Sequence, residues 1–122
     1  MELREVMRST PATRRFAAEP VPRQVVHDIL DAARFAPSGG NRQPWRVIVV
    51  DDRSTRATLR DLYTIGWREY TEHVRRGAVP FAASGRGSIG VDELAVARGT
   101  PAPNDFVDHL HEVPVLLVVT AD

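Results

Sequence analysis

The 122-residue sequence contains no cysteine and no lysine, and its formal net charge at pH 7 is zero. Without cysteine the chain has no disulfide, no thiolate nucleophile and no cysteine-ligated metal. Sixteen acidic residues balance sixteen arginines, so there is no bulk attraction to nucleic acid or to an anionic membrane. No apolar run reaches membrane-spanning length, and neither end resembles a secretory signal. We therefore expect a cytoplasmic protein with no nucleic-acid or membrane partner.

A chain of this length forms one domain with a small core, so we take residues 1–122 as a single domain. The spacing of its apolar residues predicts secondary-structure elements in the order helix, helix, strand, helix, loop, helix, strand. This order predicts an α+β fold in which a central β-sheet is flanked by helices. The expected strands are Val47–Val50 and Val115–Thr120, and the expected helices begin near Leu3, Pro22, Ser54 and Asp105.

Local signals set the ends of these segments. Proline is well suited to the first position of a helix, and the second helix therefore begins at Pro22 and continues towards Phe35. Its wide apolar stripe predicts the central packing helix. The first strand is so continuously apolar that we expect cover on both faces, and we expect the second strand to be buried as well. Gly77 ends the third helix. The residues available to cap the later helices are Asp51, Asp52, Ser54 and Asn104.

The segment from Ala78 to Pro103 is rich in glycine, alanine, serine and proline, which predicts a mobile loop that covers or flanks a ligand site. Within it, Gly85–Gly90 matches the glycine spacing of a dinucleotide-binding fingerprint. That fingerprint requires a buried strand before it and a helix that opens at its last glycine. Pro80 is incompatible with such a strand, and Val91–Ala97 is long enough for only two helical turns, so we do not favour this interpretation.

An aromatic and apolar stripe repeats at helical spacing along the third helix. Such a stripe is usually part of a core, but it also suits a contact between subunits. The sequence leaves these two alternatives open. The stripe comprises Leu59, Leu62, Tyr63, Trp67, Tyr70 and Val74.

The most informative stretch is the turn from Ala36 to Trp45, which joins the second helix to the first strand. Pro37 ends the helix, and Gly39-Gly40 permit positive φ, so that several backbone N–H groups can converge on one point. Such a concavity suits an anion or the polar edge of a ring. Three side chains add hydrogen-bonding groups beside it, and Trp45 forms a rigid wall beneath the turn. These three side chains are Ser38, Asn41 and Gln43.

The turn resembles the signature of the nitroreductase family of flavin enzymes, Ala-Pro-Ser-x-x-Asn-x-Gln-Pro-Trp, at all seven specified positions. The family also has an arginine-rich segment, Arg-Arg-Ser-x-Arg followed shortly by Phe, which binds the FMN phosphate and ribityl chain. Alignment on Phe16 places Arg14 on the last arginine of that pattern. Pro11 and Ala12 occupy earlier positions of the pattern, so part of the phosphate contact is missing or falls to neighbours such as Arg15.

The resemblance implies an FMN-dependent oxidoreductase in which NAD(P)H reduces the flavin and the flavin reduces a nitroaromatic, a quinone or another conjugated acceptor. It also implies a homodimer whose FMN site lies at the subunit interface. The cofactor-binding residues it implies are Arg14, Arg15, Ser38, Gly39, Asn41 and Gln43. Members of the family are usually longer than this chain. The competing hypothesis is therefore a non-catalytic flavin-binding or dimerisation module that retains the first half of the fold.

The side chains alone do not supply a catalytic residue. There is no Gly-x-Ser-x-Gly elbow and no nucleophile beside an evident base. His109 and His111 lie among acidic residues, but side chains two positions apart on a helix diverge, so we expect no metal site there. Redox chemistry in this chain would therefore depend on a bound cofactor.

Overall fold

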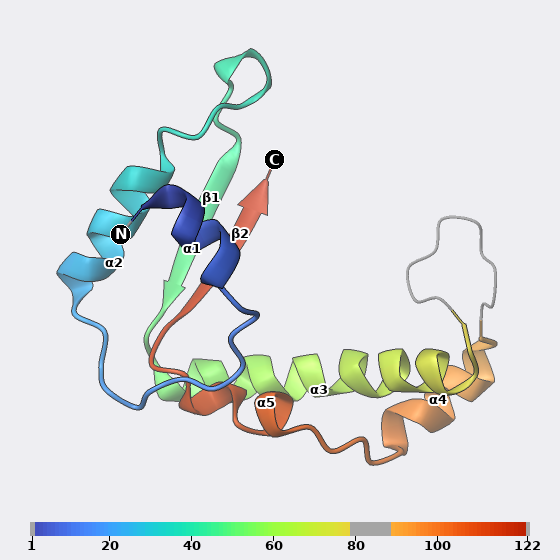
Figure 1. Ribbon diagram of the computed structural model, residues 1–122. Coiled ribbons are helices and arrows are strands. Elements are labelled where there is room, and N and C mark those ends of the chain that lie inside the picture. Colours follow the sequence, from blue (N-terminus) through green and yellow to red (C-terminus); the bar gives the residue numbers. More distant parts are fainter. Residues whose placement is uncertain (1, 79–88, 122) are drawn as a thin grey trace.

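The computed structural model describes residues 2–78 and 89–121, and Figure 1 shows their arrangement. Helices and two short strands alternate along the chain, which confirms the predicted α+β class. The α-helices are α1 (Leu3–Ser9), α2 (Arg23–Ala33), α3 (Arg53–Arg75), α4 (Val91–Gly99) and α5 (Asp105–Asp108). Two 3-10 turns, η1 (Gly39–Asn41) and η2 (Leu110–Glu112), and the strands β1 (Trp45–Val50) and β2 (Leu116–Ala121) complete the set of described elements.

The two strands pair antiparallel in one sheet. Trp45 lies opposite Ala121 at one end, and Val50 lies opposite Leu116 at the other. In Figure 1, η1 lies beyond the Trp45 end, whereas α3 crosses the molecule at the Val50 end. The pairing therefore gives the sheet two distinct ends, one next to the turn before β1 and one next to the segment before β2.

The helices occupy different sides of this sheet. Figure 1 shows α2 beside the strands and α4 returning along the long helix α3, whereas every residue of α1 is exposed. α3 also contacts α5 and η2. None of the helices within residues 2–78 and 89–121 is long and apolar enough to cross a membrane.

Several predicted helix ends are confirmed. The carboxylate of Asp52 accepts a hydrogen bond from the backbone N–H of Thr55, and Asn104 caps α5 through the N–H groups of Phe106 and Val107. Gly77 follows α3 with a φ of +68°, which glycine adopts without strain. Pro22 proves to be the residue before the first helical one rather than the first itself.

The prediction of one mobile loop from residue 78 to 103 is wrong, because α4 lies within it. Acidic residues in its first turn suit the positive end of a helix dipole, and the Glu93 carboxylate accepts a hydrogen bond from the backbone N–H of Gly90. These local stabilising contacts outweigh the glycine-rich composition of the flanking residues. Most of the disfavoured Gly85–Gly90 fingerprint lies outside the described residues.

The expectation that both strands are buried is also wrong. Ile48 is 57% exposed and Val119 is 65% exposed, and on β1 only Val50 is buried. On α2, likewise, only Val26 is buried. The buried apolar residues are instead spread over several contacts: Ala97 lies on α4, which packs along α3; Val107, Leu110 and Val113 lie in α5 and at η2, beside α3; and Val26 and Val50 lie on α2 and β1.

Arg56 is the one buried charged residue among those the structure describes, with 8% of its surface exposed. Its Nη1 donates to the carbonyl oxygen of Asp51 at 2.6 Å, and its Nε donates to the carbonyl oxygen of His111 at 3.3 Å. These two acceptors lie just after β1 and just before β2. The guanidinium therefore ties together the chain on both sides of the Val50 end of the sheet.

We predict that Arg56→Met will destabilise the fold by about 1–3 kcal/mol, because the carbonyl groups of Asp51 and His111 lose the hydrogen bonds of a buried donor. Urea denaturation followed by circular dichroism measures the loss. Arg53→Met is the matched control, since Arg53 is exposed on the same helix. Equal losses for the two variants would show that the Arg56 hydrogen bonds do not stabilise this junction.

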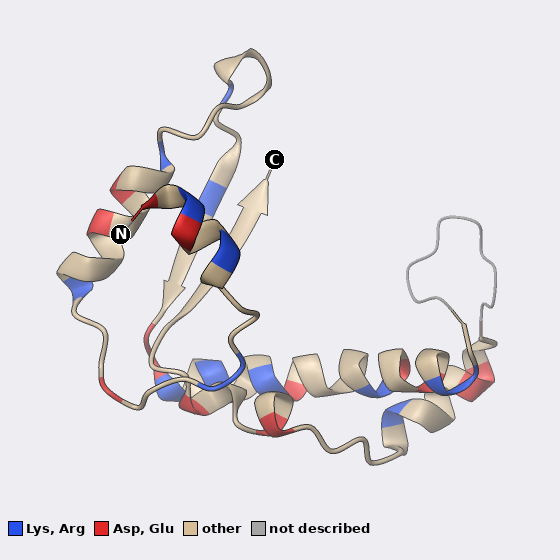
Figure 2. Cartoon of the chain, in the orientation of Figure 1, with Lys and Arg blue, Asp and Glu red and all other residues tan. Residues whose placement is uncertain are grey.

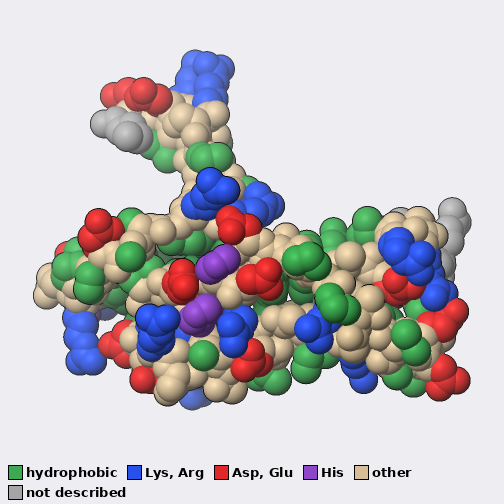
Figure 3. Space-filling model, turned by 90° about the horizontal axis from the view of Figure 1, so that it is seen from below, with side chains coloured by type: hydrophobic (Ala, Val, Ile, Leu, Met, Phe, Trp, Pro, Cys, Tyr) green, Lys and Arg blue, Asp and Glu red, His purple; other side chains and the backbone are tan. Residues whose placement is uncertain are grey.

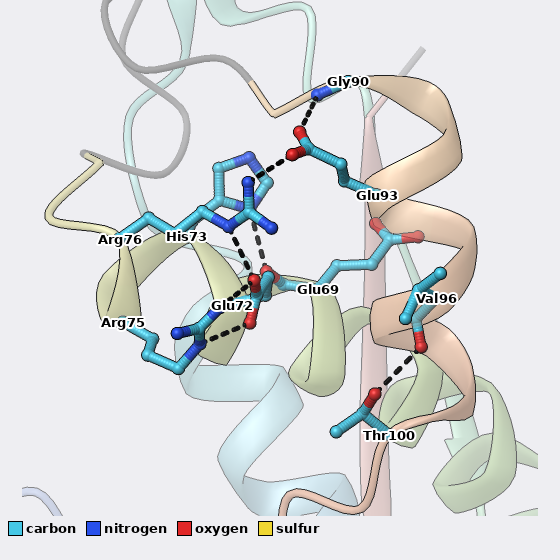
Figure 4. A network of polar contacts seen from close by, with 9 residues as sticks. All are labelled: Glu69, Glu72, His73, Arg75, Arg76, Gly90, Glu93, Val96 and Thr100. Atoms are coloured by element: carbon cyan, nitrogen blue, oxygen red, sulfur yellow. Dashed lines mark hydrogen bonds and ion pairs between the residues drawn. The ribbon is translucent and has the colours of Figure 1, made fainter.

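Ion pairs connect the end of α3 with the start of α4 (Figure 4). Arg76 pairs with both Glu72 and Glu93, each at 2.6 Å, and Arg75 pairs with Glu72 at 2.6 Å. Further along, Arg98 of α4 pairs with Glu69 of α3. Figure 2 shows acidic and basic residues on both helices. Ion pairs and packing at the buried Ala97 thus hold the two helices together.

Hydrogen bonds from Arg75 and Arg76 lower the pKa of Glu72 from 4.5 to about 2. A lowered pKa means that Glu72 contributes stability above pH 4.5 and loses it as the pH falls towards 2. We predict that Glu72→Gln is less stable than the wild type at pH 6, and that the two converge as the pH approaches 2. Urea midpoints across this range measure the difference. A constant difference at every pH would contradict the assignment, and the exposed site implies a small, salt-sensitive effect.

Candidate functional site

The turn before β1 has an unusual backbone. Gly40, Asn41 and Gln43 have φ values of 60°, 52° and 47°. Glycine adopts this region freely, asparagine less so, and glutamine only when its surroundings compensate for the strain. Of the two glycines that permit positive φ, Gly40 adopts it and Gly39 does not. Strained backbone of this kind concentrates at binding sites, which makes the turn a candidate functional site.

The Gln43 side chain holds the turn in this conformation. Its Nε2 donates to the carbonyl oxygen of Ala36 at 3.2 Å and to Oδ1 of Asn41 at 2.9 Å. Its Oε1 accepts the indole N–H of Trp45 at 2.6 Å. The backbone N–H of Gln43 in turn donates to Oγ of Ser38 at 2.9 Å. The amide thus links the two ends of the turn, and Trp45 lies against it as the sequence predicted.

These bonds also show which groups of the turn can meet a ligand. Both amide protons of Gln43 are engaged, whereas the bond to Asn41 uses its oxygen and not its amide N–H groups. The Ser38 hydroxyl accepts a bond and keeps its own proton to donate. At Gly39, a Cβ would meet no described atom within 4 Å, so the backbone there can be approached closely. Donors from Ser38, Gly39 and Asn41 are therefore available on one turn.

The arginine segment lies beside a second candidate site, a cavity of about 390 Å³ against α5 and η2. Arg15 pairs with Asp105 through its Nε at 3.4 Å, and the rings of Phe16 and Phe106 lie 6.2 Å apart. Within residues 2–78 and 89–121, Arg14 bonds its own segment, from Nη1 to the carbonyl oxygen of Ala12. Of the two arginines, Arg15 is therefore the one that pairs with a carboxylate among the described residues. The cavity is lined by Arg14, Arg15, Phe16, Ala18, Asp105, Phe106, His109, Glu112 and Val113.

His109 on the wall of this cavity adds a titratable group. Its Nδ1 donates to the carbonyl oxygen of Asp105 at 2.8 Å, and this bond raises the pKa of His109. Figure 3 shows the underside of the molecule, where histidines lie among arginine and acidic side chains. Among the described residues, no three histidine, cysteine or acidic side chains converge as metal ligands.

The structure does not bring the two sets of predicted residues together within one chain. The turn precedes Trp45 at one end of the sheet, whereas Val113 of the cavity precedes Leu116 at the other. The six residues of β1 lie between them, a separation of about 16 Å along the strand. Ser38, Gly39, Asn41 and Gln43 therefore form one group, and Arg14 and Arg15 form another.

Sequence reasoning missed the two residues that fix the arginine segment, Asp105 and Phe106. They lie ninety residues further along the chain, and no local pattern connects them to Arg15 and Phe16. Phe16, which follows the two arginines, was the signal that could have indicated such a contact. An apolar side chain in a polar segment is expected to pack against an apolar residue from another part of the chain.

Comparison with known proteins identifies relatives. A family model described as "Nitroreductase family" matches residues 7–122. NADH dehydrogenase of Thermus thermophilus is 48% identical over 48 residues, covering 39% of this chain and 23% of that protein. Iodotyrosine deiodinase 1 of Rattus norvegicus is 33% identical over 118 residues, covering 97% of this chain and 36% of that protein. The chain thus spans well under two thirds of the length of these relatives.

Among solved structures, oxidised iodotyrosine deiodinase bound to FMN and 3-iodo-L-tyrosine matches with a TM-score of 0.60 at 25% identity. The match covers 97% of this chain and 55% of that one. The likeness therefore extends over nearly the whole fold and not only over the turn. Together with the family match across residues 7–122, it shows that this chain belongs to the nitroreductase family.

Proposed function

We propose that the chain is part of an FMN-dependent oxidoreductase in which NAD(P)H is the electron donor and a nitroaromatic, a quinone or another conjugated compound is the acceptor. The observation that most supports this proposal is the strained turn, whose free donors come from the positions of the family signature. FMN supplies the redox chemistry when bound, by taking up a hydride and passing it on.

In this proposal the turn binds the flavin ring. The Ser38 hydroxyl, the Gly39 backbone and the Asn41 amide donate hydrogen bonds to its polar edge and stabilise negative charge there. Gln43, which we had counted among the cofactor-binding residues, acts by holding these donors in place. Arg14 meets the phosphate, and Arg15 assists while its contact with Asp105 orients the segment.

We further propose that the protein is a homodimer. The turn and the arginine segment lie at opposite ends of the sheet, and pairing of two copies can place the turn of one beside the arginines of the other. The exposed apolar faces of β1 and β2 support such an association. The cytoplasmic location that the sequence led us to expect stays a prediction.

The alternative is a non-catalytic flavin-binding or dimerisation module. It is supported by the fact that the chain matches only part of the length of its relatives. Both functions predict FMN binding or self-association, but only the enzyme oxidises NAD(P)H. Purified protein reconstituted with FMN should therefore oxidise NADH or NADPH in the presence of a quinone or nitroaromatic acceptor. Flavin-loaded protein that leaves both nicotinamides unoxidised would favour the module.

We predict that Gly39→Val abolishes FMN binding and leaves the fold intact, since the space around Gly39 is open within the chain and the new side chain would occupy the ligand's position. Flavin fluorescence titration and circular dichroism measure the two effects. Gly99→Val is the control, because Gly99 has equally open surroundings and lies outside the turn. Unchanged FMN affinity in Gly39→Val would place the flavin elsewhere.

We predict that Arg14→Ala weakens FMN binding by about ten- to a hundredfold, the effect of losing one charge-assisted contact. Riboflavin, which lacks the phosphate, should bind the variant almost as well as the wild type. Arg15→Ala is the comparison, and we expect a smaller loss because Asp105 already engages Arg15. If FMN and riboflavin lose affinity equally, Arg14 acts through structure and not through the phosphate.

We predict that Gln43→Leu and Asn41→Ala both weaken flavin binding but differ in the free protein. Removing the Gln43 amide frees the indole N–H of Trp45, so the ¹⁵N–¹H resonance of that group should move before any flavin is added. Asn41→Ala should leave it nearly in place. The opposite order of effects on the Trp45 resonance would show that Gln43 does not organise the turn.

A further inference from the structure

A groove of about 340 Å³ lies on α3, away from both candidate flavin segments. Of the described residues, those that line it are Tyr63, Gly66, Trp67 and Tyr70. Their spacing of three, four and seven residues puts them on one face of the helix. Three aromatic rings therefore surround one residue that has no side chain.

The rings are held in a defined arrangement. The indole N–H of Trp67 donates to the carbonyl oxygen of Ala102 at 3.0 Å, which fixes this ring against the segment between α4 and α5. Tyr70 stacks on Trp67 with ring centroids 5.4 Å apart and ring planes inclined by 24°. The wall of the groove is thus a preformed aromatic surface and not a set of loose side chains.

Gly66 keeps the groove open. Glycine in the middle of a helix is unfavourable, and here neither a positive φ nor a close neighbour requires it. A Cβ at this position would meet no described atom within 4 Å. A larger side chain at this position would fill the groove. The glycine therefore leaves room for a ligand and is not required by packing.

The character of the lining restricts what can occupy the groove. Tyr63 is 48% exposed and Tyr70 is 39% exposed, so their rings are accessible. No arginine, aspartate or glutamate is among the described lining residues, and a charged ligand would lose hydration there without gaining a partner. Aromatic rings favour stacking with another planar ring.

We infer that this groove is a binding site for an uncharged planar aromatic ring, which stacks on the wall formed by Trp67 and Tyr70 and passes over Gly66. This site is separate from the turn that contains Gln43 and from the segment that contains Arg14. It gives this part of the aromatic stripe of α3 a role different from the core or the subunit contact that the sequence left open.

The test uses the two indole N–H resonances of the ¹⁵N-labelled chain, one each from Trp45 and Trp67, assigned with Trp45→Phe. The protein is titrated with anisole, with methoxycyclohexane, its non-planar counterpart, and with benzoate, its charged counterpart. We expect anisole alone to shift the Trp67 resonance saturably and to leave Trp45 unmoved.

Gly66→Leu should remove the anisole shift, and Gly99→Leu, the same change at another helical glycine with open surroundings, should keep it. Gly66→Ala replaces Gly66→Leu if circular dichroism shows that the latter does not fold. A similar response to methoxycyclohexane, or a shift that survives in the Gly66 variants, would overturn the inference.

A Trp67 resonance that moves with protein concentration and ignores anisole would also overturn it, because a second copy would then cover the groove. The outcome is independent of the proposed flavin chemistry. FMN binding at the turn is reported by Trp45 through its bond to Gln43, so either site can fail while the other is confirmed.

Discussion

The antiparallel pairing of β1 with β2 determines where every candidate group lies. Because Trp45 is opposite Ala121 and Val50 is opposite Leu116, the residues before β1 and the residues before β2 must lie at opposite ends of the sheet. Arg56 reinforces this arrangement by binding carbonyl groups on both sides of one end. The family signature and the arginine segment are therefore held apart by backbone hydrogen bonds, and no side-chain rearrangement within one chain brings them together.

The turn shows how a short sequence sets up donors for a ligand. Three features determine its conformation. Gly40 tolerates positive φ, the Gln43 side-chain amide donates a hydrogen bond across the turn to Asn41, and the Trp45 indole N–H donates to that amide. These hydrogen bonds offset the backbone strain at Asn41 and Gln43, and they do not use the donors of Ser38, Gly39 and Asn41. The Gln43 amide is bonded within the turn and the Asn41 amide N–H groups are not, a difference that the residue types alone could not show.

Much of the fold could be predicted from local sequence because local chemistry decides it. Asp52, Asn104 and Gly77 act within a few residues of their own positions, and the expectations for these two caps and for the end of α3 are confirmed. Whether a residue is buried depends on which other segments pack against it. The exposed faces of β1 and β2 could therefore not be predicted from local sequence. The same holds for the contacts between Arg15 and Asp105 and between Phe16 and Phe106, which join distant parts of the chain.

The central claim is that the flavin site is assembled from the turn of one copy and the arginine segment of another. Mixing Gly39→Val with Arg14→Ala tests it directly, because a mixed dimer contains one site with both changes and one site with neither. If the two variants exchange freely, about a quarter of all sites should regain wild-type FMN affinity, although neither variant binds well alone. Flavin titration of the mixture measures this fraction. A mixture that binds FMN no better than the sum of its separate components, although sedimentation shows that mixed dimers have formed, would contradict the account.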